Sequence, residues 1–127
     1  MSGGSRHLCS VPALGPQTVV VALPAEIDMT NDGQVQHTLT GALGDGTAVL
    51  VADGSGTSLC ASSGVAALLA AHRRAAAAGT QLRIASSPAL RRVLELTGAD
   101  HLLDTYPTLA AALADGTGAP AYRPHWK

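Results

Sequence analysis

A buried strand followed by a polar loop and a helix is the feature that most constrains the fold of this chain. The apolar run at residues 49–53 predicts the strand, and the apolar spacing of residues 65–78 predicts the helix. The loop between them ends in Ser62-Ser63-Gly64, so two serine hydroxyls lie at the start of the helix. The first turn of a helix leaves backbone N–H groups unsatisfied and carries a partial positive charge. Either serine is therefore a candidate N-cap, and a phosphate added at this position would be stabilised.

Strand-like and helix-like segments alternate along the rest of the chain. Buried strands are predicted at residues 18–23, 47–51 and 81–85, and a short edge strand at 101–105. Capping candidates and glycines predict where the helices begin and end. One helix is expected to start at Thr30-Asn31-Asp32 and to end at Gly44, and the helix at 65–78 ends at Gly79. A third helix is expected from Ser87-Pro88 to Gly98, and Pro107 opens a last helix with Leu109, Ala112 and Leu113. This alternation predicts an α/β fold in which helices cover a largely parallel sheet. Such sheets meet ligands and partners at the C-terminal ends of their strands, here the connections at 24–30 and 53–64.

The composition indicates a folded domain and excludes several classes of function. The chain has 127 residues, of which 46% are hydrophobic and 13% charged, with a net charge of −1 and no phenylalanine. This length fits a single domain with an aliphatic core. A nearly neutral chain with few aromatic residues has no electrostatic or stacking surface for nucleic acid, and none for anionic lipid. We therefore expect neither nucleic acid nor a membrane among its partners.

The ends of the sequence and its cysteines bear on domain organisation and location. We expect a flexible segment at residues 1–16, a domain at 17–115 and a tail at 116–127, with a short strand within 6–14 as an open alternative that Pro12 weakens. The first residues lack the apolar core of a signal peptide, and no window reaches the roughly 18 apolar residues of a membrane span. Only Cys9 and Cys60 are present, which does not suggest a disulfide scaffold. We therefore expect a cytoplasmic protein.

The order of these elements and the loop residues resemble the STAS domain of bacterial anti-sigma factor antagonists. Residues 25–28 (Ala-Glu-Ile-Asp) are similar to the Gly-Glu-Leu-Asp of that family, and Asp53 matches the acidic residue that ends its next strand. Residues 61–64 (Ala-Ser-Ser-Gly) resemble its Asp-Ser-Ser-Gly switch loop. The resemblance covers residues 18–114 and implies a STAS-like fold, with a mostly parallel or mixed sheet of four to five strands and about four helices.

The resemblance implies a function in partner switching. The unmodified antagonist of this family binds an anti-sigma factor that is also an ATP-binding, histidine-kinase-like serine kinase, and thereby frees a sigma factor. Phosphorylation of the first serine of the switch loop releases the antagonist, and a serine phosphatase resets it. Carried over to this sequence, the phosphorylated residue is Ser62, and no cofactor is implied.

The contact surface for the kinase is predicted around that serine. It would include two acidic residues, the second serine and the start of the helix, which are Glu26, Asp28, Ser63, Gly64, Val65 and Leu68. A phosphate adds about −1.5 to −2 charges at neutral pH, and a nearby Asp28 would add like-charge repulsion. Phosphorylation would then weaken binding at the interface without refolding the domain.

Two other functions stay open at the level of the sequence. Ala61 stands where the family usually has an acidic residue, which favours a STAS-type scaffold or interaction subunit that is not phosphorylated. A small-ligand binder or enzyme that uses the strand-end crevice is the second alternative, but no nucleophile with a base and an orienting residue can be assembled. We therefore expect no enzymatic activity.

Other polar groups have simpler interpretations. Residues 53–57 (Asp-Gly-Ser-Gly-Thr) lack the ending of a phosphate-binding loop and are interpreted as a flexible loop in which Asp53 fixes a turn. The histidines, which include His37, His72 and His101, have no metal-ligand spacing, so no metal site is predicted.

Overall fold

A four-stranded parallel sheet forms the centre of the protein in the computed structural model, which describes residues 18–44 and 46–114. Its strands lie in the order β1 (Thr18–Ala22), β3 (Val49–Gly54), β5 (Gln81–Ser86) and β6 (Asp104–Tyr106). The helices are α1 (Asp32–Gly41), α2 (Ser62–Ala77), α3 (Pro88–Thr97) and α4 (Leu109–Leu113), with a 3₁₀ turn, η3, at Ala99–His101. The predicted α/β class, the parallel sheet and the four helices are confirmed.

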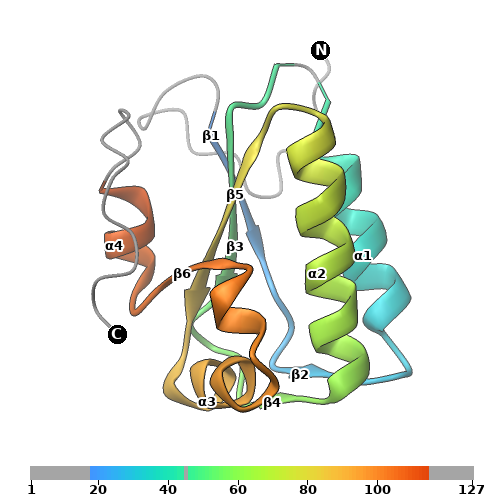
Figure 1. Cartoon of the computed structure of the whole chain (residues 1–127), viewed down its shortest axis with the longest axis vertical. Helices are drawn as coiled ribbons and strands as arrows, with labels where there is room; N and C mark the ends of the chain where they lie inside the picture. Colours follow the sequence, from blue (N-terminus) through green and yellow to red (C-terminus); the bar gives the residue numbers. More distant parts are fainter. Residues whose placement is uncertain (1–17, 45, 115–127) are drawn as a thin grey trace.

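Helices cover the two faces of the sheet unequally. The helices α1 and α2 lie side by side on one face, and α4 lies on the opposite face (Figure 1). The larger core is on the α1–α2 side, where Leu50 and Ala52 of β3 and Leu82 and Ile84 of β5 are buried. The smaller core on the other face contains buried residues of four strands and of α4, namely Val20, Val49, Val51, Ala85, Tyr106 and Ala112. Burial of both faces explains why β1 and the first four residues of β3 are almost continuously apolar.

Both faces of β5 are buried, as the predicted buried strand at 81–85 requires, and one face carries a charged side chain. Leu82 and Ile84 face the larger core, whereas Arg83, which points to the other face, is also buried. Its Nη1 donates to the carbonyl oxygen of Ala112 at 2.8 Å, and its guanidinium lies 5.7 Å from the ring centre of Tyr106. A buried charge needs such partners, and here they hold α4 against the sheet.

Several predicted boundaries were wrong by two or three residues. The first helix ends at Gly41 instead of Gly44, and the second long strand begins at Val49 instead of Thr47. The Thr47 hydroxyl donates to the carbonyls of Ala42 and Gly44, so this threonine closes the turn before the strand.

The C-terminal elements differ in the same way. The edge strand lies at Asp104–Tyr106, because His101 belongs to the 3₁₀ turn. The last helix is capped by Thr108, whose hydroxyl accepts from the N–H of Ala111 at 2.9 Å, instead of being opened by Pro107.

Three predictions lie outside the described residues. They are the flexible segment at 1–16, the tail at 116–127 and the alternative strand within 6–14. They stay predictions.

Candidate functional site

A two-stranded ribbon joins the two connections that the sequence singled out. Within 24–30 and 53–64 lie β2 (Glu26–Ile27) and β4 (Leu59–Cys60), which pair in parallel with Glu26 opposite Leu59. The pairing continues one step further, because the N–H of Ala61 donates to the carbonyl of Ile27 at 2.8 Å. The segment that carries Asp28 and the segment that carries Ser62 are therefore neighbours, as the resemblance implied.

Ala61, and neither serine, is the N-cap of α2. Its backbone is extended, and no side chain caps the helix. Its carbonyl accepts the first bonds of the helix, from the N–H groups of Gly64 at 2.9 Å and Val65 at 3.2 Å. The prediction that Ser62 or Ser63 caps the helix was wrong, because both residues lie inside its first turn. An uncapped N-terminus keeps its affinity for an anion.

The two serines differ in their access to solvent. Ser62 is exposed at the first position of the helix. The hydroxyl of Ser63 is buried and has no hydrogen-bond partner. Ser62 is therefore accessible from solvent in this conformation, whereas the Ser63 hydroxyl is not.

Gly64 lets the first turn of α2 approach the inner face of the ribbon. A Cβ atom at this position would lie 2.6 Å from Cγ2 of Ile27 and 2.8 Å from Sγ of Cys60. Real Cβ atoms do not approach other atoms this closely, so a side chain at position 64 would force Ile27 and Cys60 to shift. Burial raises the pKa of the Cys60 thiol, which keeps this thiol in its neutral form.

Asp28 forms a tight turn beside the ribbon. Its Oδ1 accepts from the N–H of Thr30 at 2.9 Å and from the hydroxyl of the same residue at 2.5 Å. The side chain of Asn31 reaches back to the N–H of Asp28 and the carbonyl of Glu26, and so does not cap α1. The hydrogen bond from the Thr30 hydroxyl is the main reason why the pKa of Asp28 lies below its ordinary value. A fixed negative charge therefore stands close to the start of α2.

Two of the predicted contact residues cannot offer their side chains to a partner. Val65 is 4% exposed and Leu68 is 0% exposed, because both pack into the larger core. This part of the predicted surface was wrong, since a helix this close to the sheet turns these two positions inward. Glu26 is exposed, Asp28 and Ser63 are partly exposed, and Gly64 is buried under the ribbon.

The loop at 53–57 is held by hydrogen bonds and is less free than the sequence suggested. Asp53 fixes a turn as predicted, through bonds to its Oδ1 from the N–H and the hydroxyl of Ser55. Thr57 is buried, and its hydroxyl donates to the carbonyl of Pro24 at 2.9 Å. Gly54 has no room for a side chain, because a Cβ atom there would lie 2.5 Å from Leu90. The loop is therefore held against the segment before β2 and supports the ribbon.

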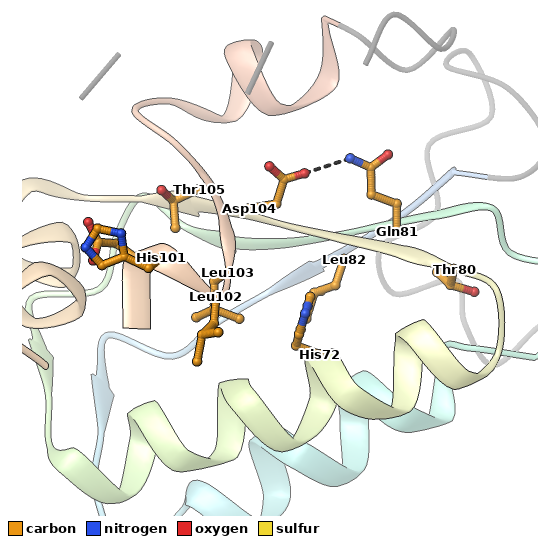
Figure 2. A pocket seen from close by; sticks show the side chains of 10 residues that line it. His72, Thr80, Gln81, Leu82, His101, Leu102, Leu103, Asp104 and Thr105 are labelled. Carbon is orange, nitrogen blue, oxygen red and sulfur yellow. Dashed lines mark hydrogen bonds and ion pairs between the residues drawn. The ribbon is translucent and has the colours of Figure 1, made fainter. Parts of the chain in front are cut away.

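A hollow lies away from the ribbon, between α2 and the β6 side of the sheet. Its volume is about 520 Å³, and its lining includes His72, His101, Leu102 and Leu103. Figure 2 shows His72 reaching from α2 toward β5, whereas Gln81 and Asp104 are joined by a hydrogen bond on the other side of the strands. No local sequence pattern predicts that His72 and His101 border one hollow, because they come from different elements.

The described part of the chain holds no cluster of three or more histidine, cysteine or acidic side chains that could hold a metal ion. Among the helices described, none is long and apolar enough to cross a membrane. 

Comparisons with known proteins identify the family. Residues 11–104 match the family model described as "Mlab, STAS domain". This chain belongs to the STAS domain family. A comparison with curated proteins gives no match.

Solved structures with the same fold include regulators and transporters. An anti-sigma factor antagonist from Mycobacterium paratuberculosis is 28% identical with a TM-score of 0.72, over 82% of this chain and 89% of that one. The anti-sigma factor antagonist SpoIIAA in its unphosphorylated form is 22% identical with a TM-score of 0.59, over 72% of this chain and 82% of that one. The murine anion transporter Slc26a9 is 17% identical with a TM-score of 0.66, over 80% of this chain but 18% of the transporter. The last two similarities concern the fold alone.

Proposed function

We propose that this protein is an anti-sigma factor antagonist, which binds an anti-sigma serine kinase and is released when Ser62 is phosphorylated. The observation that carries the proposal is the exposed Ser62 at the uncapped start of α2, beside the Asp28 turn. The similarity to the Mycobacterium antagonist over most of both chains supports the same role. In this function the protein acts by binding, and the kinase and a resetting phosphatase supply the chemistry.

The phosphoryl transfer uses groups that this surface presents. The Oγ atom of Ser62 would attack the γ-phosphorus of ATP in the kinase site, with loss of its proton and departure of ADP. The first turn of α2 would then stabilise the new phosphate, since no side chain occupies its N-cap. In the complex, the same charge would have to be desolvated next to the Asp28 carboxylate, which opposes binding.

The proposal is tested by the affinity of the purified protein for the anti-sigma kinases encoded in its own genome. Wild type and Ser62→Ala should bind one of them with similar affinity, and Ser62→Asp should bind at least tenfold more weakly. Thr38→Asp is the matched control, because Thr38 is also exposed but lies in the second half of α1. Equal binding by wild type and Ser62→Asp would contradict the switch.

A second candidate function is a STAS scaffold or interaction subunit that is not phosphorylated. Ala61 favours it, because the N-cap has a methyl group where the switch loop of antagonists usually has a carboxylate. Intact-mass measurement of the protein from its native cells separates the two functions. A fraction of molecules heavier by one phosphate supports the switch, and a single unmodified species supports the scaffold.

A further inference from the structure

The outer face of the β2–β4 ribbon and the turn after β2 each carry one large apolar side chain that is exposed and does not belong to the core. Glu26 and Leu59 are paired and exposed, whereas their neighbours Ile27 and Cys60 are paired and buried against α2. Leu59 is 51% exposed and Met29, at the turn after β2, is 79% exposed. Both flank the segments that carry Asp28 and Ser62. Exposed apolar side chains bordered by polar groups are typical of protein interaction sites.

The charges around these two side chains have one sign on the side of β2 and α1. Glu26, Asp28 and Asp32 are all at least partly exposed there. The sequence has no lysine or arginine between residues 7 and 72. On α3, which contacts β4, Arg91 pairs with Glu95 of its own helix at 3.8 Å. A surface that complements the β2 side therefore has to be basic.

We infer that Met29 and Leu59 are apolar anchors for the kinase, which receives them in an apolar socket bordered by lysine or arginine side chains. The inference rests on the proposed function and adds the chemistry of the partner. These anchors are separate from the phosphorylated residue, so their contribution to affinity is present before the phosphate is added. Phosphorylation then weakens the complex without changing the two anchors. The complex can therefore form again as soon as the phosphate is removed.

The test is isothermal titration calorimetry of the purified kinase with a set of variants. Met29→Ser and Leu59→Ser should each bind about tenfold more weakly than wild type, a factor that fits the burial of one such side chain. Leu102→Ser is the matched control, because Leu102 is 62% exposed and borders the hollow near β6. It should bind like wild type. All three substitutions are at the surface, so thermal melting should confirm that each variant folds.

If the socket has a basic border, the same titrations should also show an effect of salt concentration. Glu26→Gln should weaken binding and reduce its dependence on salt concentration, because one ion pair across the interface is lost. Unchanged salt dependence would contradict the basic character of the socket.

The outcomes separate this inference from the proposed function. If Ser62→Asp loses binding but Met29→Ser and Leu59→Ser bind within twofold of wild type, the anchors are wrong and the switch stands. If the serine variants at 29 and 59 lose binding but Ser62→Asp does not, the anchors stand and the switch is wrong. Absence of binding by wild type overturns both. A wild-type dimer that Leu59→Ser converts to a monomer, with unchanged kinase affinity, would assign this face to a second copy of the chain.

Discussion

Two helices of this protein begin with serine residues after a parallel strand, and their first turns are built in opposite ways. At α3, the Ser87 hydroxyl accepts from the N–H of Leu90 at 3.0 Å and donates to the carbonyl of Thr57, and Pro88 follows at the first helical position. At α2, Ala61 provides no cap and Ser62 is exposed. The start of α3 is therefore a capped junction with a buried serine, whereas the start of α2 is an open junction, because no side chain caps it and it keeps its capacity to bind an anion. Similar sequence signals therefore serve stability in one place and, by our proposal, regulation in the other.

The largest expected change in the free energy of unfolding comes from removing the serine of the capped junction, at the start of α3. Ser87→Ala loses the cap and leaves the buried N–H of Leu90 and carbonyl of Thr57 without this partner, which should lower the free energy of unfolding by about 2 kcal/mol. Ser62→Ala, at the open junction, should change it by less than about 0.5 kcal/mol. Urea denaturation followed by circular dichroism measures both. Equal losses would show that the two serines have the same structural role.

A smaller loss is expected from Gly64→Ala, which tests why the open junction needs a glycine. The new methyl group would collide with Ile27 and Cys60, and overpacking of this kind should cost about 1 kcal/mol after the better helix propensity of alanine is subtracted. Gly41→Ala in α1 is the control, because no atom lies within 4 Å of its Cβ position. It should be neutral or slightly stabilising. A Gly64→Ala protein that is more stable than wild type would contradict the close packing of α2 against the ribbon.

Restoring a carboxylate to the open junction should stabilise the protein. Ala61→Asp supplies the missing cap and a favourable charge at the helix N-terminus, which should raise the free energy of unfolding by about 1 kcal/mol. Ala66→Asp, at an exposed position one turn further on, offers no cap and should give no gain. If both variants have the same stability, the N-terminus of α2 is already satisfied by another group.

The smallest effect concerns the charge beside the junction. Thr30→Val removes the hydroxyl that donates to Asp28, so the pKa of Asp28 should rise toward its ordinary value. Because this pKa is lowered in the folded protein, the associated stabilisation is present above the unfolded pKa and is lost as the pH falls through the folded one. NMR titration of the side-chain carboxyl measures the shift, with the exposed Thr38→Val in α1 as control. An unchanged midpoint in Thr30→Val would assign the lowered pKa to another cause.

The order and type of the long elements could be predicted from the sequence, because each carries a strong local signal. Strand β5 has alternating Leu82 and Ile84, and α3 begins with Ser87-Pro88 and ends before Gly98, whose φ of 78° favours glycine. Such signals depend on residues close together in the chain. The rule that parallel sheets meet partners at the C-terminal ends of their strands then indicated 24–30 and 53–64, and the family resemblance indicated the residues within them.

The parts that the sequence did not reveal depend on contacts between distant residues. The ribbon of β2 and β4 has two residues in each strand, too few for a periodic pattern. Arg83 interrupts the apolar residues of β5, and its partners on the far face, the carbonyl of Ala112 and the ring of Tyr106, belong to segments more than 20 residues away. The position of the α2 cap depends on how Gly64 packs against the ribbon, which is why the helix begins at Ser62 instead of after Ser63.

Phosphorylation of the purified protein by its kinase and ATP, followed by intact-mass measurement and peptide mapping, shows whether Ser62 is the residue that the kinase modifies. We expect one phosphate per molecule, located on Ser62 and absent from Ser62→Ala, while Ser63→Ala is modified like wild type. Phosphate on Ser63, or undiminished incorporation into Ser62→Ala, would contradict the account, because the hydroxyl of Ser63 is buried.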